Sequence, residues 1–78
     1  MKGKTNKLEY NYRKLRGKIK EIFTNEELFA PLIGINRASL SSRLNNKSSF
    51  SQYEISKSAE LLDIPDEDIN LYFFCSKG

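Results

Sequence analysis

Arginine, lysine, asparagine and serine side chains gather between residues 36 and 48, and they are the groups best suited to recognising another molecule. Arginine can donate paired hydrogen bonds to a phosphate or a guanine edge, whereas serine and asparagine both donate and accept. Catalysis has far weaker support, because histidine is absent and no carboxylate pair stands beside a recognisable nucleophile or metal ligand. We therefore predict a binding protein rather than an enzyme, with no metal and no other cofactor.

These groups are expected on one short helix, from Arg37 to Asn45. Asn36 is a favourable N-cap for this helix, and only Leu40 and Leu44 within it are strongly apolar. At roughly 100° per residue, the two leucines define the buried side. The opposite side is predicted to carry small polar residues between two cations: Ala38, Ser39 and Ser42, flanked by Arg37 and Arg43. A helix with so little apolar bulk fits the major groove of DNA better than a protein core.

The predicted contacts with DNA follow from this placement. Base contacts are predicted for the N-cap and the outward side of the helix: Asn36, Arg37, Ala38, Ser39, Ser42 and Arg43. Phosphate contacts are predicted for the preceding helix start, the rest of this helix, the loop after it and the N-terminal segment: Asn25, Ser41, Asn45, Lys47, Ser48, Lys2, Lys4 and Lys7. Arg37 is the best candidate for a paired contact with guanine, because it lies in the exposed first turn.

The distribution of charge supports an anionic partner. The chain has 78 residues and a formal net charge of +3, and residues 1–20 are strongly basic whereas residues 60–68 are acidic. Such an asymmetry favours a polyanion on one side of the molecule, although a solvated helix face would give the same composition. The length allows one domain at most. We predict a flexible basic arm over residues 1–9 and a single DNA-binding domain over residues 10–75.

The helices before this one are predicted from apolar spacing and capping residues. Apolar side chains recur at helical spacing from Asn11 to Phe23: Tyr12, Leu15, Ile19 and Ile22. Thr24 and Glu27 have the spacing of a capping box, so a second helix is expected to begin at Asn25. Its apolar face is predicted to hold Leu28, Phe29, Leu32 and Ile33. Gly34 is expected to end it as a C-cap glycine.

The helices after it are predicted in the same way. Ser51 and Glu54 have the spacing of a second capping box, which opens a fourth helix. Pro65 suits the start of a short fifth helix, whose apolar residues are Ile69, Tyr72 and Phe73. No alternating apolar run or hairpin turn predicts a strand. The fold class predicted is all-α, with five helices in one compact domain.

The stretch from Glu26 to Lys47 resembles the helix-turn-helix of lambda-repressor-like DNA-binding proteins, the Cro and phage-repressor type. Ala30 stands four residues before Gly34, the turn continues through Ile35 and Asn36, and Leu40 follows. The resemblance covers about residues 11–74 as a five-helix plan, with the helix-turn-helix at about residues 25–45. It implies that the start of the second helix of this motif reads bases.

Three residues depart from the pattern of that family. Pro31 lies inside the second helix, where its ring removes an amide donor, so we expect a kink or a short helix. Arg43 occupies a position that is often aliphatic, and Leu44 is expected to take over its packing role. Glu26 places a carboxylate where DNA phosphates would repel it.

The C-terminal tail is unusually aromatic and is predicted to contribute to self-association. One recognition helix covers a half-site, and specific binding generally needs two half-sites about one helical turn apart. We predict a homodimer with an interface of three residues near the chain end: Leu71, Tyr72 and Phe74. The alternative is that all of the tail covers the core of one monomer. Cys75 is predicted to be a small hydrophobic residue at the edge of that core.

The predicted function is a sequence-specific transcriptional regulator that binds double-stranded DNA. The resemblance indicates a phage-type repressor, seated as a dimer on a pseudo-palindromic operator. The alternative is a protein-interaction adaptor, similar to an antitoxin or an anti-repressor, that uses the same fold without reading bases. A cytoplasmic protein without a small-molecule ligand is expected. No membrane partner is expected, because no apolar run approaches the roughly 20 residues of a membrane span.

Overall fold

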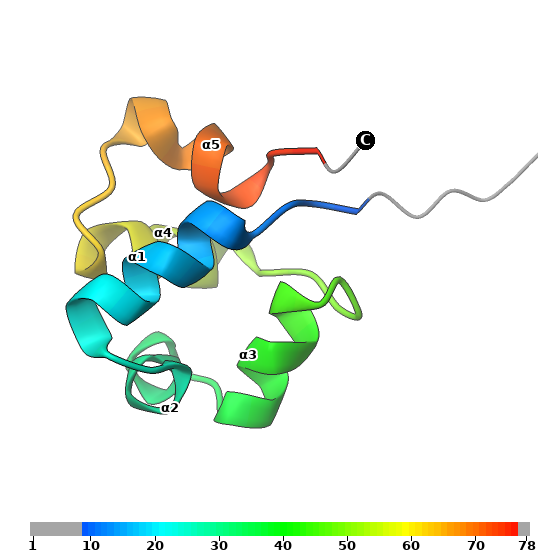
Figure 1. Cartoon of the computed structure of the whole chain (residues 1–78), viewed down its shortest axis with the longest axis vertical. Helices are drawn as coiled ribbons and strands as arrows, with labels where there is room; N and C mark the ends of the chain where they lie inside the picture. Colours follow the sequence, from blue (N-terminus) through cyan, green and yellow to red (C-terminus); the bar gives the residue numbers. More distant parts are fainter. Residues whose placement is uncertain (1–8, 77–78) are drawn as a thin grey trace, which may run out of the picture.

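The computed structural model describes residues 9–76 and is all-α, as predicted (Figure 1). Five α-helices and two short 3-10 helices follow one another along the chain: α1 (Arg13–Phe23), α2 (Glu26–Phe29), η1 (Ala30–Ile33), α3 (Arg37–Leu44), α4 (Gln52–Leu61), η2 (Asp66–Asp68) and α5 (Ile69–Phe73). Helix α1 contacts both α2 and α5, and α2 with η1 contacts α3. No helix within residues 9–76 is long and apolar enough to cross a membrane.

Helix α1 runs through the middle of the molecule, with α5 on one side and α2 and α3 on the other (Figure 1). Its inward side chains are Tyr12, Leu15 and Ile19, as the spacing predicted. Ile22 was predicted to continue this stripe, but that prediction was wrong, because its side chain is 43% exposed at the end of the helix. Phe23 packs against Phe29 instead, with ring centroids 5.3 Å apart.

The core joins every α-helix of the described chain. Its buried apolar residues are Tyr12, Leu15, Ile19, Phe29, Ala30, Ile33, Leu40, Leu44, Ala59, Leu62, Ile64 and Phe73. A fully buried leucine or phenylalanine stabilises the fold by about 1.5–3 kcal/mol relative to leaving it in water. Leu40 and Leu44 are the buried residues of α3, so the prediction of its inward side is confirmed.

Helix α2 begins one residue later than predicted and buries a different face. Asn25 is the N-cap and accepts a hydrogen bond from the Leu28 amide at 2.9 Å, whereas Thr24 ends α1 with a φ of 77°. The predicted Thr24 capping box was therefore wrong. Leu28 and Leu32 were predicted to face inward, yet they are 57% and 46% exposed. Phe29 and its neighbours in η1 take the inward positions, which leaves both leucines on the outside.

Pro31 shortens the second helix, as predicted. The α-helical hydrogen bonding ends at Phe29, and Ala30–Ile33 continues as a 3-10 helix with Pro31 in its first turn. Gly34 then adopts a left-handed conformation with a φ of 84°, where a residue with a side chain would be strained. Its amide donates to the Pro31 carbonyl at 3.0 Å, so the chain turns sharply into α3.

The two caps that frame α3 and α4 form as predicted. The Asn36 side chain accepts a hydrogen bond from the Ser39 amide at 2.8 Å and starts α3. The Ser51 hydroxyl accepts from the Glu54 amide at 3.1 Å, and the Glu54 carboxylate accepts from the Ser51 amide at 3.0 Å. Both ends of this capping box are therefore satisfied, and α4 begins at Gln52.

The two ends of the described chain lie against each other. Tyr10 and Ser76 form an isolated antiparallel bridge, and the Asn11 amide donates to the Cys75 carbonyl at 2.7 Å. The Cys75 side chain is exposed, so the prediction that it packs at the core edge was wrong. Its main chain, and not its thiol, ties the tail to the start of the domain.

Candidate interaction surface around helix α3

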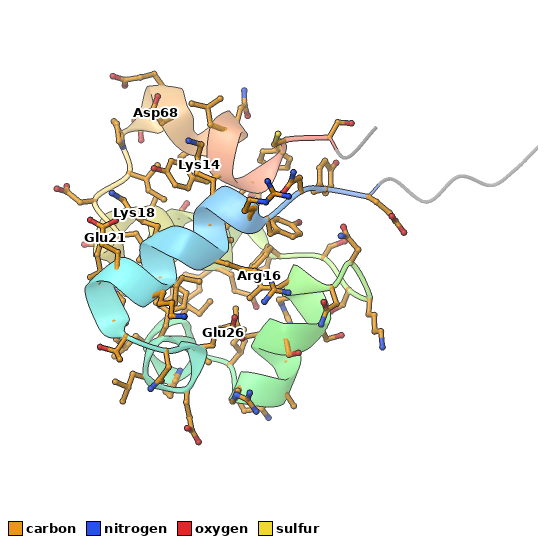
Figure 2. All side chains as sticks on the ribbon, in the orientation of Figure 1. Lys14, Arg16, Lys18, Glu21, Glu26 and Asp68 are labelled. Carbon is orange, nitrogen blue, oxygen red and sulfur yellow. The ribbon has the colours of Figure 1, made fainter. Side chains whose placement is uncertain are left out.

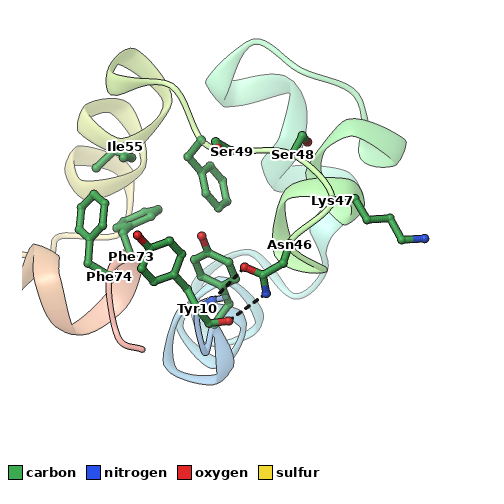
Figure 3. A pocket seen from close by; sticks show the side chains of 10 residues that line it. Tyr10, Asn46, Lys47, Ser48, Ser49, Ile55, Phe73 and Phe74 are labelled. Carbon is green, nitrogen blue, oxygen red and sulfur yellow. Dashed lines mark hydrogen bonds between the residues drawn. The ribbon is translucent and has the colours of Figure 1, made fainter. Parts of the chain in front are cut away.

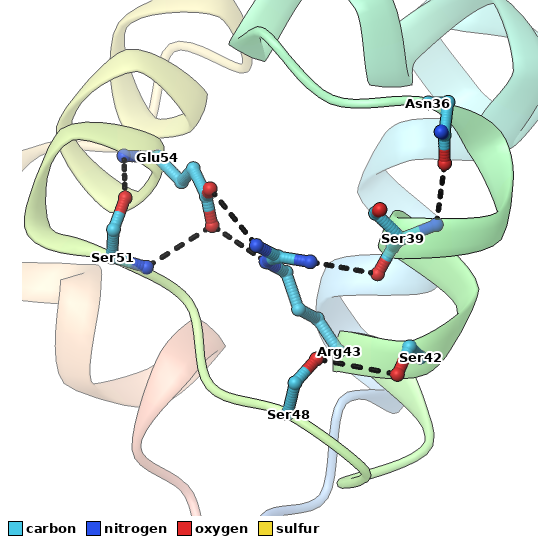
Figure 4. Close-up of polar contacts among 7 residues, drawn as sticks. All are labelled: Asn36, Ser39, Ser42, Arg43, Ser48, Ser51 and Glu54. Carbon is cyan, nitrogen blue, oxygen red and sulfur yellow. Dashed lines mark hydrogen bonds and ion pairs between the residues drawn. The ribbon is translucent and has the colours of Figure 1, made fainter.

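Helix α3 has one side closed by polar contacts and one side open. Figure 4 shows the closed side, where Arg43 points toward α4 and not toward solvent. Its guanidinium donates to both Glu54 carboxylate oxygens, at 2.7 Å from Nε and 3.2 Å from NH2. The third nitrogen donates to the Ser39 carbonyl at 3.1 Å. All three guanidinium nitrogens of Arg43 thus have acceptors within the fold.

This placement corrects the prediction that Arg43 flanks an outward strip. The Arg43 and Glu54 side chains are only 19% and 10% exposed. The sequence suggested a free cation because Glu54 lies eleven residues away, on another helix. A paired and largely buried guanidinium is costly to withdraw, because the carboxylate that it leaves would remain buried without its charge partner.

Two serines predicted to face outward also lie on the closed side. Ser39 and Ser42 are half-buried, and the Ser39 carbonyl accepts the hydrogen bond from Arg43. The Ser48 hydroxyl donates to the Ser42 hydroxyl at 3.2 Å (Figure 4). Fewer residues of α3 therefore face outward than the helical periodicity suggested, and they centre on Arg37 and Ala38.

The open side of α3 faces the C-terminal half of α1 across a polar groove. A hollow of about 540 Å³ lies between α1, the start of α2 and α3, and its lining includes Lys20, Glu26, Glu27, Arg37 and Ser41. Lys20 and Arg37 make no ion pair within residues 9–76. This hollow thus presents free cations from two helices, beside carboxylates from a third.

Arg16 spans the groove from α1 and holds its walls together (Figure 2). Its guanidinium pairs with the Glu26 carboxylate at 3.1 Å. It also donates to the Asn45 side chain at 3.2 Å and, more weakly, to the Leu44 carbonyl at 3.5 Å. Beyond Arg16 lies a second hollow of about 330 Å³, lined by Arg13 and Asn45 among others. Arg16 lines both hollows, and the two adjoining hollows together are hereafter called the α1–α3 groove.

The residues after α3 take separate roles. Asn45 lies at the groove, and its amide donates to the Ser41 hydroxyl at 3.3 Å. Asn46 holds the N-terminal segment, accepting from the Tyr10 amide at 2.9 Å and donating to the Tyr10 carbonyl at 3.0 Å (Figure 3). Lys47 is exposed and extends away from the body of the molecule (Figure 3). Of the predicted phosphate contacts in this loop, Lys47 is the one whose charge is free.

An aromatic pocket of about 490 Å³ lies beyond this loop (Figure 3). Tyr12 contacts Phe50 edge to face with centroids 5.5 Å apart, and Phe50 contacts Phe73 in the same manner at 5.3 Å. Burial raises the pKa of the Tyr12 phenol above its ordinary value of 10.0, and the nearby Tyr10 phenol raises it further. Tyr12 and Phe73 were expected among the apolar residues of their helices, and with Phe50 they pack as a continuous aromatic cluster.

The remaining predicted site residues belong to other elements than α3. Asn25 is occupied as the N-cap of α2, and it also lines the first hollow of the groove together with Arg37. Lys2, Lys4 and Lys7, with most of the predicted basic arm, lie outside the described residues. In the tail, Leu71 and Phe74 are half-exposed, while Tyr72 lies under the Lys14 ammonium, 5.7 Å from its ring centroid. The two-fold interface at these three residues stays a prediction.

Sequence reasoning missed the long-range contacts on both sides of α3. Arg16 was counted only within the basic stretch of residues 1–20 and Glu54 only as part of a capping box, although both bind side chains of other elements. Their partners lie ten and eleven residues away, which no local spacing rule detects. Within residues 9–76, no group of three or more histidine, cysteine, aspartate or glutamate residues could hold a metal ion.

The described chain is thus a small helical protein with a polar groove between α1, α2 and α3. A family described as protein of unknown function (DUF739) matches residues 8–76, and the chain belongs to that family. A solved structure is also similar to it, the modulator of repression (MOR) of the temperate bacteriophage TP901-1 from Lactococcus lactis. The sequences are 35% identical, the match covers 83% of this chain and 88% of the other, and the TM-score is 0.72. No curated protein matches the chain.

The comparison refines the earlier resemblance. The match supports a helical regulator of phage type, but it does not specifically support the lambda-repressor-like helix-turn-helix family. It points to a modulator of repression where the sequence had suggested the repressor itself. The interaction adaptor, which was the alternative from the sequence, is thus the better supported of the two functions.

Proposed function

We propose that the chain modulates repression in a temperate phage by binding a repressor protein, and that it does not act by reading operator bases. The observation that carries this proposal is the match to the modulator of repression of phage TP901-1, at 35% identity over 83% of the chain. A protein that modulates repression must contact the repressor, its DNA or both. The contacts around α3 favour binding to the repressor over binding to its DNA.

The closed side of α3 argues against base readout. Base contacts in the major groove need side chains that project freely from the outward face of a helix. Arg43 is bound to Glu54, and Ser39 and Ser42 are half-buried. Asn36 uses its side-chain oxygen as a cap. Of the predicted base-contacting residues, this leaves Arg37 as the long polar side chain free to project.

The carboxylates beside α3 argue in the same direction. Glu26 and Glu27 line the groove that Arg37 faces. Arg16 neutralises Glu26, but Glu27 is exposed and makes no ion pair within residues 9–76. A duplex backbone offers only negative charge here, so Glu27 would repel it, whereas a protein surface can place a cation opposite Glu27.

A second candidate is direct binding of an operator by α3, as the sequence first suggested. It is favoured by the exposure of Asn36, Arg37 and Ala38 at the start of the helix, where base contacts usually concentrate. Under this candidate Lys47 would contact a phosphate and strengthen binding to every duplex about equally. Homodimer formation through Leu71, Tyr72 and Phe74 belongs to the same candidate.

Isothermal titration separates the two candidates. The full chain is titrated into the repressor encoded by the same phage genome, and separately into duplexes that carry the operators of that phage. We expect saturable binding to the repressor with a defined stoichiometry, and only weak, salt-sensitive binding to the duplexes. Tight binding to one operator over a random duplex, without binding to the repressor, would overturn the proposal and support the second candidate.

A further inference from the structure

The α1–α3 groove combines free cations with one free carboxylate. Lys20 and Arg37 line its first hollow, and Arg13 lines its second. None of these three side chains makes an ion pair or hydrogen bond within residues 9–76, whereas Arg16 between them is paired with Glu26. The uncompensated charge in the groove is therefore positive along α1 and α3, and negative at Glu27.

The walls of the groove are joined by its own contacts. Arg16 connects α1 to both Glu26 and the end of α3, so the three elements are tied to one another across the groove. The hollows of about 540 Å³ and 330 Å³ lie on either side of this bridge. Each is large enough for several side chains of one partner segment, and a site that is already formed costs less ordering on binding.

The arrangement of charge favours a protein segment over a nucleic acid. Acidic side chains three or four residues apart on a helix share one face and could meet Lys20 and Arg37 together. A basic side chain on the same segment could meet Glu27. A phosphate backbone has no cation to offer, and Glu27 would stay unpaired against it.

We propose that the α1–α3 groove is the docking site for a charged segment of the partner protein, with carboxylates against Arg13, Lys20 and Arg37 and a basic side chain against Glu27. This inference rests on the proposed function, and it names the surface and the chemistry of that contact. The mixed charge of the groove sets both the orientation of the segment and its discrimination against polyanions.

Charge reversal on two sides of one helix tests the groove. Lys20→Glu and Lys18→Glu make the same change two residues apart on α1, but Lys18 faces Glu21 outside the groove, at 4.0 Å (Figure 2). The probe is the full-length repressor of the same phage, titrated with the unmodified chain, each variant and the double variant with Arg37→Glu. We expect Lys20→Glu with Arg37→Glu to weaken binding about tenfold or more and Lys18→Glu to leave it within about twofold.

The variant Glu27→Lys distinguishes a protein partner from a nucleic acid. We expect this variant to bind the repressor more weakly, because the basic side chain of the repressor segment loses the Glu27 carboxylate as its partner. If the groove takes DNA instead, Glu27→Lys would bind a random duplex more tightly, and that result with unchanged repressor binding would overturn the inference. Thermal melts by circular dichroism verify that each variant is folded.

The outcomes separate the inference from the function on which it rests. If the unmodified chain binds the repressor and charge reversal at Lys20 and Arg37 leaves the affinity unchanged, the groove is not the docking site, while the proposed function stands. Equal losses for Lys18→Glu and Lys20→Glu would also overturn it, because the effect would then be general charge. If the unmodified chain does not bind the repressor, both the function and the groove are overturned.

Discussion

Each side of helix α3 carries one arginine, and the two arginines differ in their contacts. Toward α4, Arg43 is held by two carboxylate oxygens of Glu54 and by the Ser39 carbonyl. Toward α1, Arg37 is exposed and unpaired within residues 9–76, at the rim of a polar groove. Arg43 therefore holds α3 against α4, whereas Arg37 is available to a partner.

This difference is set by what lies opposite each arginine. Glu54 is only 8% exposed and is fixed by the Ser51 capping box, so its carboxylate is already oriented when Arg43 reaches it. Arg37 instead lines the hollow toward α1, where no carboxylate pairs with it within residues 9–76. The closed side holds α3 in place, and the open side presents its remaining charge to a partner.

The largest effect is expected from breaking the closed side. Glu54→Ala leaves the Arg43 guanidinium largely buried without its charge partner and removes one half of a capping box. We expect the free energy of unfolding to fall by about 3 kcal/mol, measured by urea denaturation. Glu60→Ala on the same helix is the control, because its exposed pair with Lys57 should contribute less than about 0.5 kcal/mol.

The bridge in the open groove is expected to contribute less. Arg16→Met keeps most of the aliphatic length and removes the pair with Glu26, whose two side chains are 41% and 26% exposed. Solvent screening limits the expected loss in the free energy of unfolding to about 1 kcal/mol. A loss that exceeds that of Glu54→Ala would contradict the view that the closed side carries the greater share of stability.

Much of the framework around α3 could be predicted from local sequence. Asn36, the Ser51–Glu54 box and Gly34 act within a few residues of themselves, so their spacing is sufficient to predict the caps. Pro31 predicted its own effect on α2 for the same reason. The buried leucines of α3 followed from helical periodicity, because nothing else on that helix could fill a core.

The side of α3 that is open to solvent could not be predicted in this way. Periodicity placed Arg43 near the surface, but the chain that follows folds back over it and supplies Glu54. Leu28 and Leu32 fit the same helical spacing as Phe29 and Ile33, but the buried face lies one position further along the helix and includes Ala30. Both errors arise because packing against other elements overrides the local pattern.

A smaller gain is expected from Ser58, one turn after Glu54 on α4. Its hydroxyl is fully buried and has no hydrogen-bond partner within the described chain, in contrast to the paired groups of the closed side. Ser58→Ala should raise the free energy of unfolding by about 0.5 kcal/mol, because it removes an unsatisfied buried group at little loss of volume. A marked decrease in the urea midpoint would mean that this hydroxyl is stabilising after all.

The smallest effect is expected at alkaline pH, from Tyr12 beside the second hollow of the groove. Its pKa is raised in the folded chain, chiefly by burial, so the phenol ionises more readily in the unfolded chain. The resulting contribution to stability is complete below the ordinary pKa of 10.0 and is lost as the pH rises past it. Thermal melts from pH 8 to 11 should show a steeper decline for the unmodified chain than for Tyr12→Phe; equal declines would count against the raised pKa.

The central claim, that α3 meets its partner on the side facing α1, is tested most directly by mapping amide chemical shifts. The chain labelled with ¹⁵N is titrated with the repressor of the same phage. The amides of Lys20, Glu27, Arg37 and Ser41 should shift or broaden, while those from Ser48 to Glu54 stay in place. Changes confined to the segment from Ser48 to Glu54, with the groove amides unmoved, would contradict it.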